Sequence, residues 1–263
     1  MGGANVRSSG IVAIVTGCLV AWAPPAFADS SCNAVLGGEW LEANGVCATE
    51  VTSIRQAIMT LSVGIPRELI DDPTAGPVLR EYMRTRIDDW RTTGATMVRA
   101  NEASTQPTVY SHGSVRSVVF HEYWWTVGNM QNNAYRTFTF DLASGRQLGL
   151  ADLFASHVDP LSALPPLVRP YLVPALDAAE PPHSPGTYPF TTQEWEPQLD
   201  GSGYSGEYRA FALTDNELIL YMPDAPMAHE NLWPQDRLVW SMDGGTVIVR
   251  VPLTALAPVL RPL

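Results

Sequence analysis

The sequence contains no lysine. Its 263 residues include 16 basic side chains, all of them arginine, against 27 aspartates and glutamates, which gives a net charge of −11. A chain this acidic lacks the positive surface that nucleic acid or anionic lipid requires. The composition therefore argues against nucleic-acid binding and favours a partner that is itself basic.

Motifs that carry known chemistries are also missing. His121 and Glu122 begin like a zincin motif, but Trp125 stands where the second histidine is required, and the five histidines of the chain are scattered. The glycine-rich segment 201–206 lacks the last glycine of a nucleophile elbow, and no phosphate-binding glycine loop is present. The sequence therefore predicts no catalytic residue, no metal site and no cofactor.

Long apolar runs are confined to the N-terminus. Ile11–Ala23 is apolar, follows Arg7, and precedes small residues at 26–28 of the kind that a signal peptidase reads. This run is too short to span a bilayer comfortably. The layout predicts a cleaved secretion signal over 1–28 and a single secreted domain over 29–263, with an anchoring helix as the alternative.

The three cysteines suggest two different chemistries. Cys18 ends the sequence Val-Thr-Gly-Cys, which resembles a lipobox, so lipidation of Cys18 and membrane attachment are an alternative to conventional cleavage. Cys32 and Cys47 form an isolated pair just after the predicted cleavage site. In an exported chain such a pair usually forms a disulfide, with two unrelated buried thiols as the alternative.

The segment 115–154 has the strongest β-forming pattern. Segments 115–127 and 135–142 predict two antiparallel strands, and 147–154 predicts a short strand that runs into a helical turn. The first strand is apolar on both faces, whereas the second alternates between apolar and polar residues. The first strand is therefore expected either to be covered on both faces or to expose an aromatic surface.

The remaining elements mix strands and helices without a regular alternation. This mixture predicts an α+β fold with a largely antiparallel sheet, and with an amphipathic helix and short helices on one face. The predicted strands are 56–65, 107–112, 208–213, 217–222, 237–242 and 246–251, and the predicted helical segments are 78–92 and 160–178. Segment 252–260 is expected to be a short helix or a turn. Prolines are expected to break 160–178 into one or two short helices. Segment 179–207 is expected to be a long surface loop.

Two aromatic groups are candidates for binding. Tyr123, Trp124 and Trp125 lie on the predicted first strand, where neighbouring tryptophans must face opposite ways. Either helices cover both faces, or one face provides a partner-binding patch, since aromatic residues are frequent interface anchors. The alternative lies in the acidic loop 188–207, where Glu194 and Glu196 flank Trp195 in a composition that is typical of glycan-binding or hydrolytic sites.

Three segments resemble the RsiV-type C-terminal domain family. Its signature is similar to Phe140-Asp141-Leu142-x-x-Gly145-x-x-Leu148-x-Leu150-x-Asp152-Leu153-Phe154, and its closing segments resemble 211–221 and 249–256. The resemblance covers about 32–256, with the RsiV-like core over 115–256. The layout of a signal, a cysteine pair, a strand and a helix before this core is similar to that of the family's secreted mycobacterial immunogenic members.

The resemblance implies a compact α+β domain without known enzymatic activity. In RsiV itself the extracellular domain binds lysozyme, and a cytoplasmic segment holds a sigma factor. The present sequence shows no such cytoplasmic segment, so the anti-sigma role is not expected to carry over. The implied function is binding of an extracellular or envelope protein, and a basic protein such as lysozyme or a host protein would suit the acidic composition.

Overall fold

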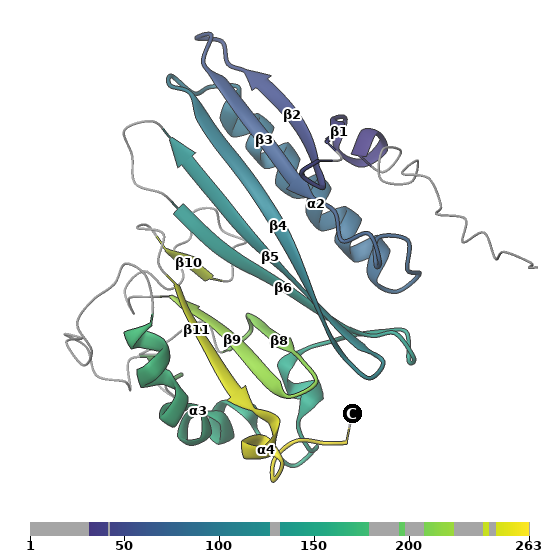
Figure 1. Cartoon of the computed structure of the whole chain (residues 1–263), viewed down its shortest axis with the longest axis vertical. Helices are drawn as coiled ribbons and strands as arrows, with labels where there is room; N and C mark the ends of the chain where they lie inside the picture. The colour runs from purple at the N-terminus through teal and green to yellow at the C-terminus, as the bar shows by residue number, and fades with distance from the viewer. Residues whose placement is uncertain are drawn as a thin grey trace, which may run out of the picture.

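The computed structural model describes residues 32–41, 43–126, 132–178, 195–197, 208–223, 239–241 and 246–262. These residues form two β-sheets and flanking helices (Figure 1). The strands are β1 (Glu39–Leu41), β2 (Val46–Thr52), β3 (Ile58–Gly64), β4 (Asn101–His112), β5 (Val115–Thr126), β6 (Asn132–Asp141), β7 (Arg146–Leu148), β8 (Phe211–Leu213), β9 (Glu217–Pro223), β10 (Val239–Ser241) and β11 (Thr246–Pro252). The helical elements are η1 (Cys32–Leu36), α2 (Ala75–Gly94), η2 (Leu150–Leu153), α3 (Pro160–Asp177) and α4 (Leu253–Leu256).

The large sheet has the strand order β1-β2-β3-β4-β5-β6-β10, and β7 also pairs with β6. All its pairings are antiparallel except that of β3 with β4. Parallel neighbours need a long crossover connection, and α2 provides it between β3 and β4. The predicted α+β class with a largely antiparallel sheet is confirmed.

The central hairpin forms as the sequence predicts. β5 and β6 pair in register from Val115 opposite Asp141 to Trp124 opposite Asn132. The tight turn after β6 contains Gly145 at φ +66°, a backbone conformation that glycine adopts without strain. Hydrogen bonds from the Ser144 and Ser114 hydroxyls lower the pKa of Asp141 to about 2, so this carboxylate remains ionised and holds the turn.

Helix α2 covers one face of the large sheet because its apolar residues recur at three- and four-residue spacing. Leu79, Met83, Ile87 and Trp90 are buried against the sheet. Two backbone N–H groups at the start of the helix donate to the Asp72 carboxylate, each at 2.8 Å. Aspartate is among the residues that most often accept hydrogen bonds from the first N–H groups of a helix.

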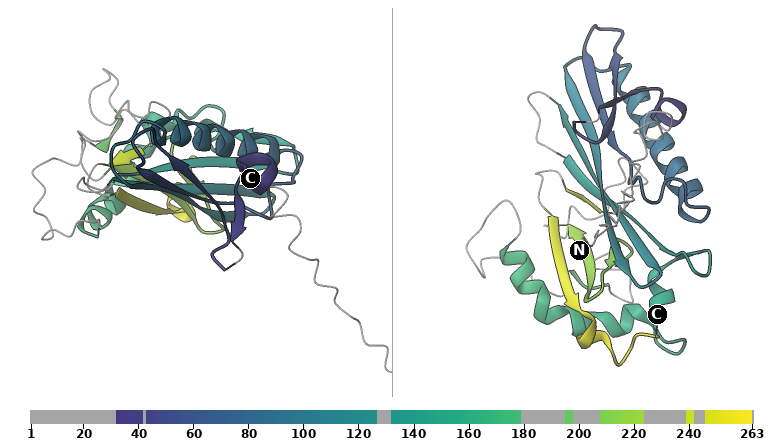
Figure 2. Two further views of the ribbon diagram at one scale, coloured as in Figure 1. Left: turned by 90° about the horizontal axis from the view of Figure 1, so that it is seen from above. Right: turned by 45° about the vertical axis from the view of Figure 1, so that its right-hand side comes forward.

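The second sheet, β11-β9-β8, packs against the opposite face of the large sheet, and α3 packs on β11. Figure 2 shows the resulting order of layers, with α2 on one outer side and α3 on the other. Helix α3 therefore lies on the second sheet rather than beside α2. The sequence indicated the strands of this second sheet but not their separation from the large one.

The expectation that prolines break 160–178 is wrong, because α3 is one continuous helix of 18 residues with four internal prolines. Its buried residues lie four apart and pack against the second sheet: Leu164, Val168, Leu172 and Leu176. The internal prolines at 166, 170 and 174 are exposed on the outer side. Packing of the apolar stripe therefore outweighs the hydrogen bonds that these prolines cannot make.

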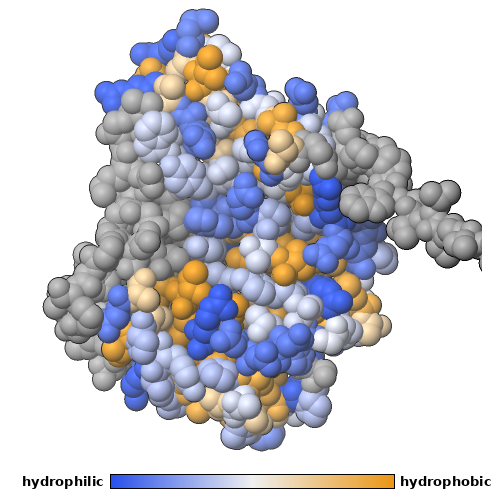
Figure 3. Space-filling view, in the orientation of Figure 1, coloured by the Kyte–Doolittle hydropathy of each residue, from blue (hydrophilic) through white to orange (hydrophobic). Residues whose placement is uncertain are grey.

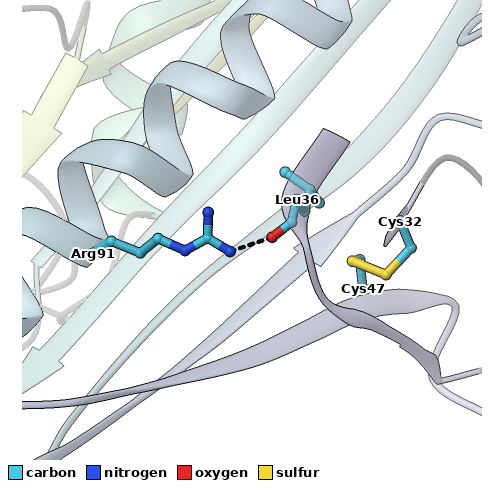
Figure 4. The surroundings of a disulfide bond; sticks show 4 residues. All are labelled: Cys32, Leu36, Cys47 and Arg91. Atoms are coloured by element: carbon cyan, nitrogen blue, oxygen red, sulfur yellow. Dashed lines mark hydrogen bonds between the residues drawn. A yellow bond between two sulfur atoms is a disulfide. The ribbon is translucent and has the colours of Figure 1, made fainter. Parts of the chain in front are cut away.

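Residues 32–52, which we call the N-terminal arm, contain two strands that the sequence pattern does not predict. Strands β1 and β2 extend the large sheet, and the predicted Cys32–Cys47 disulfide is present, with a sequence separation of 15. Figure 4 shows the bond joining η1 to β2, while Arg91 of α2 donates to the carbonyl oxygen of Leu36. The disulfide and this hydrogen bond fix the arm to both the sheet and the helix.

We expect the paired substitution Cys32→Ser and Cys47→Ser to lower the free energy of unfolding by about 3 kcal/mol, because the loop is no longer closed in the unfolded chain. Urea denaturation measures this loss. Asn33→Ser, an exposed substitution in the same segment, is the matched control and should leave the urea midpoint unchanged. A midpoint that is also unchanged in the paired variant would show that the bond does not constrain the arm.

No helix in the described part of the chain is long and apolar enough to cross a membrane. The predicted signal segment 1–28, with the candidate lipid-bearing Cys18, lies outside the described residues. Most of the predicted surface loop 179–207 also lies outside them, apart from 195–197.

Candidate partner-binding surface

The alternation of β5 separates the three candidate aromatic residues. Trp124 lies on the α2 side and packs against the core beneath that helix. Tyr123 and Trp125 lie on the opposite face, and all three side chains are partly exposed. The predicted opposite orientation of Trp124 and Trp125 is therefore present, and helix α2 covers only the Trp124 side.

The face that carries Tyr123 and Trp125 continues across four neighbouring strands. Glu102 of β4 lies opposite both Trp125 and Thr60, and Ser104 lies opposite both Tyr123 and Ser62. We call this surface the open face. It comprises Glu39, Glu50, Ile58, Thr60, Ser62, Glu102, Ser104, Gln106, Tyr123 and Trp125, all of them exposed or partly exposed.

Figure 3 views the molecule from this side. Over β2 to β5 the surface is mostly blue and white, with only isolated orange groups. The open face is therefore a hydrophilic sheet surface that carries a few aromatic rings. This composition differs from the buried aliphatic face beneath α2.

The second sheet covers the other part of the same face. Val119 of β5 is buried there against Ile219 and Tyr221 of β9. The His121 ring stacks on Tyr135, and Tyr135 stacks on Tyr221, each with ring centroids 4.6 Å apart. His121 therefore marks the boundary between the covered and the open parts.

The tyrosines of this stack are neutral. Burial, with a smaller effect of neighbouring Tyr110, raises the pKa of Tyr135 to about 12. Burial and a hydrogen bond with Tyr110 also raise the pKa of Tyr221. Tyr135 and Tyr221 therefore support the boundary of the open face as uncharged rings near neutral pH.

The charge on the open face is negative. Glu39, Glu50 and Glu102 are exposed on it, and among the described residues that it comprises none is arginine. Burial and the charge of Glu102 raise the pKa of Tyr123, so this phenol is uncharged at neutral pH. The open face thus combines carboxylates with two neutral aromatic side chains.

The reverse side of β5 carries a buried polar network. The Tyr82 hydroxyl donates to Glu122 at 2.8 Å, and Arg86 lies 3.9 Å from the same carboxylate. The side chains of Arg86 and Glu122 are each 1% exposed, and burial is the main cause that raises the pKa of Tyr82. No local sequence pattern indicates this network, because Tyr82 and Arg86 lie far from Glu122 along the chain.

The structure places His121 and Glu122 on opposite faces of β5, as their adjacency in a strand requires. Within the described ranges, no group of three or more histidine, cysteine, aspartate or glutamate side chains lies close enough to hold a metal ion. The described residues therefore offer no assembled ligand set for a zincin-type centre.

A groove of about 550 Å³ lies between α2 and β6. Its lining is mainly apolar, and the Tyr82 hydroxyl in this lining donates a hydrogen bond to Glu122. The lining residues are Pro77, Val78, Glu81, Tyr82, Thr85, Arg136 and Phe138.

The glycan-binding alternative does not agree with the position of Trp195. This side chain is 1% exposed and belongs to the core between the second sheet and α3. Glu196 is also buried and accepts two hydrogen bonds from Arg169, at 2.8 and 3.0 Å. A sugar platform needs an accessible ring, so Trp195 and Glu196 are structural residues, while Glu194 lies outside the described residues.

The sequence matches no protein-family model and no curated protein. Solved structures that are similar include a member of the DUF3298 family from Bacteroides fragilis NCTC 9343 and a DUF3298 family protein from Pseudomonas aeruginosa PAO1. Each is 14% identical with a TM-score of 0.48, over 82% of this chain and 92% or 93% of the other chain. The resemblance to the RsiV-type family stays a prediction.

Proposed function

We propose that this chain is an exported, non-enzymatic protein that binds a basic protein partner through the open face. Export is supported by the Cys32–Cys47 disulfide, because such bonds persist in oxidising compartments. The predicted secretion signal over 1–28 points to the same compartment.

The observation that carries this proposal is the position of Tyr123 and Trp125 on a sheet face whose charges are all acidic. Aromatic rings are common anchors at protein interfaces. Arginine and lysine side chains of a partner gain from contact with aromatic rings and from neighbouring carboxylates. Together these groups fit a partner surface rich in basic residues.

Binding to immobilised lysozyme, used as a strongly basic probe, tests this proposal. We expect the paired substitution Tyr123→Ala and Trp125→Ala to weaken binding by at least about tenfold, since interface aromatics typically contribute more than 1 kcal/mol each. The paired substitution Glu50→Gln and Glu102→Gln should mainly slow association and reduce its dependence on salt.

The matched control is Tyr171→Ala on α3, a partly exposed aromatic that packs against the core of the second sheet. It should bind like the unmodified protein. No binding of the unmodified protein at low salt would remove the proposal for lysozyme-like partners. Binding that is equally weakened by Tyr171→Ala would place the interface elsewhere.

A further inference from the structure

Two turns lie side by side at one end of the large sheet. One connects β2 to β3 through 53–57, and the other connects α2 to β4 through 95–100. The Ile54 N–H donates to the carbonyl oxygen of Ala95 at 3.1 Å, which joins the two turns directly. Figures 1 and 2 show the β2–β3 turn at the upper extremity of the molecule.

Both turns present aliphatic side chains to solvent. Ile54 is 81% exposed, Val98 is 60% exposed, and Ile58 at the start of β3 is 46% exposed. These are three of the six exposed large hydrophobic residues in the described part of the chain. Half of that set is therefore concentrated at a single extremity. Exposed aliphatic residues that are scattered singly over a surface are common, whereas a cluster of them indicates a site of interaction.

The exposure of Ile54 is fixed by the turn that carries it. The buried Ser53 hydroxyl accepts hydrogen bonds from the N–H groups of Arg55 and Ala57, at 3.1 and 3.0 Å. The Ser53 N–H also donates to the Ala57 carbonyl oxygen at 2.8 Å. The turn therefore holds Ile54 outward in a defined conformation.

The charge at this end is opposite to that of the whole chain. Segments 51–58 and 93–101 contain Arg55 and Arg99 but no acidic residue. Each arginine directly follows an exposed aliphatic residue, and both are exposed. We call Ile54, Arg55, Ile58, Val98 and Arg99 the basic tip. The nearest acids along the chain are Glu50 on β2, which precedes the first turn, and Glu102 on β4, which follows the second.

We infer that the basic tip docks on the surface of a bilayer that contains anionic lipid. Aliphatic side chains on protruding turns gain free energy by entering the boundary between headgroups and acyl chains. Adjacent arginines stay at the level of the headgroups and bind lipid phosphate. This site goes beyond the proposed function and uses different residues from Tyr123 and Trp125.

The acidic composition of the chain does not oppose this contact strongly. At physiological ionic strength, charges more than about 8 Å apart are largely screened. The basic tip therefore interacts with lipid headgroups mainly through its own two arginines. Composition averages over the whole chain, which is why it predicts no binding to anionic lipid, whereas the two turns themselves carry arginine and no acid, with Glu50 and Glu102 in the neighbouring row of the sheet beside Thr60.

Sedimentation with vesicles tests this inference, using Cys18→Ser chains so that no lipid can be attached there. The chain should bind vesicles of phosphatidylcholine mixed with phosphatidylglycerol more tightly than vesicles of phosphatidylcholine alone. Ile54→Ser with Val98→Ser should weaken binding by at least about tenfold. Arg55→Gln with Arg99→Gln should weaken binding to the anionic vesicles by about thirtyfold, since each arginine contributes about 1 kcal/mol.

The matched control is Val173→Ser with Ile248→Ser, which removes exposed aliphatics from α3 and β11. It should bind vesicles like the parent chain. The inference is overturned if the parent chain binds neither vesicle, or if the tip variants bind as the parent does. The inference is also overturned if the tip variants lose lysozyme binding but keep vesicle binding, because the tip would then bind a protein partner. Tyr123→Ala should leave vesicle binding intact, which separates this site from the open face.

Discussion

Glu122→Ala is expected to lower the free energy of unfolding by about 3–5 kcal/mol, the cost of breaking a buried charge pair by removing one partner. The substitution takes away the carboxylate that lies 3.9 Å from Arg86 and accepts the Tyr82 hydroxyl. Arg86 keeps its contact with Asp89 at 2.7 Å, but that carboxylate is largely exposed. Urea denaturation followed by circular dichroism gives the change directly.

Two further variants separate loss of the charge pair from loss of packing. Glu81→Ala removes an exposed acid from α2, the helix that also carries Tyr82 and Arg86. It should change the free energy of unfolding by less than about 0.5 kcal/mol. Combining Glu122→Leu with Arg86→Met should recover much of the loss, since apolar residues of similar volume often replace buried ion pairs without cost. A Glu122→Ala protein with unchanged stability would contradict the structural role of this network.

Trp195→Ala is expected to destabilise the protein by about 3–5 kcal/mol, as is usual when a buried tryptophan is truncated. The ring is 1% exposed and packs in the core between the second sheet and α3. Its removal leaves a cavity that the apolar stripe of α3 cannot fill. Thermal and urea denaturation should both show the loss.

Val173→Ala on α3 is the matched control for this variant, because its side chain is 42% exposed. It should change the stability by no more than about 0.5 kcal/mol. A Trp195→Ala protein that keeps its stability but loses binding to cell-wall polysaccharide would instead support a glycan-binding function for loop 188–207.

Local pattern predicted most elements of this fold. The hairpin of β5 and β6 follows from two adjacent runs of β-forming residues around a polar turn, and α2 follows from apolar spacing after Asp72. Such signals act between near neighbours. They placed the bounds of β4 less well, since that strand begins at Asn101, well before the predicted 107.

Tertiary packing decided the elements that sequence misjudged. Helix α3 continues through its prolines because its Leu and Val stripe is buried on β11, which comes about 70 residues later in the chain. Strands β1 and β2 exist because β3 provides their pairing edge and the disulfide holds η1 against β2. Neither effect is visible in a local window.

The candidate site was only partly predictable for the same reason. Strand alternation showed that Trp124 and Trp125 face opposite ways, but it did not show which face lacks a helix. The acidic residues that complete the open face come from β1, β2 and β4. The buried position of Trp195 depends on contacts with the second sheet, so the acidic composition of its loop was misleading.

Oxidative footprinting of the protein, free and bound to a basic protein partner, tests the central claim most directly. Hydroxyl radicals modify accessible aromatic side chains, and mass spectrometry of the peptides measures the rate at each one. We predict that partner binding slows oxidation of Tyr123 and Trp125 and leaves Tyr171 on α3 unchanged. Unchanged rates at Tyr123 and Trp125, together with protection of Tyr171, would contradict binding through the open face.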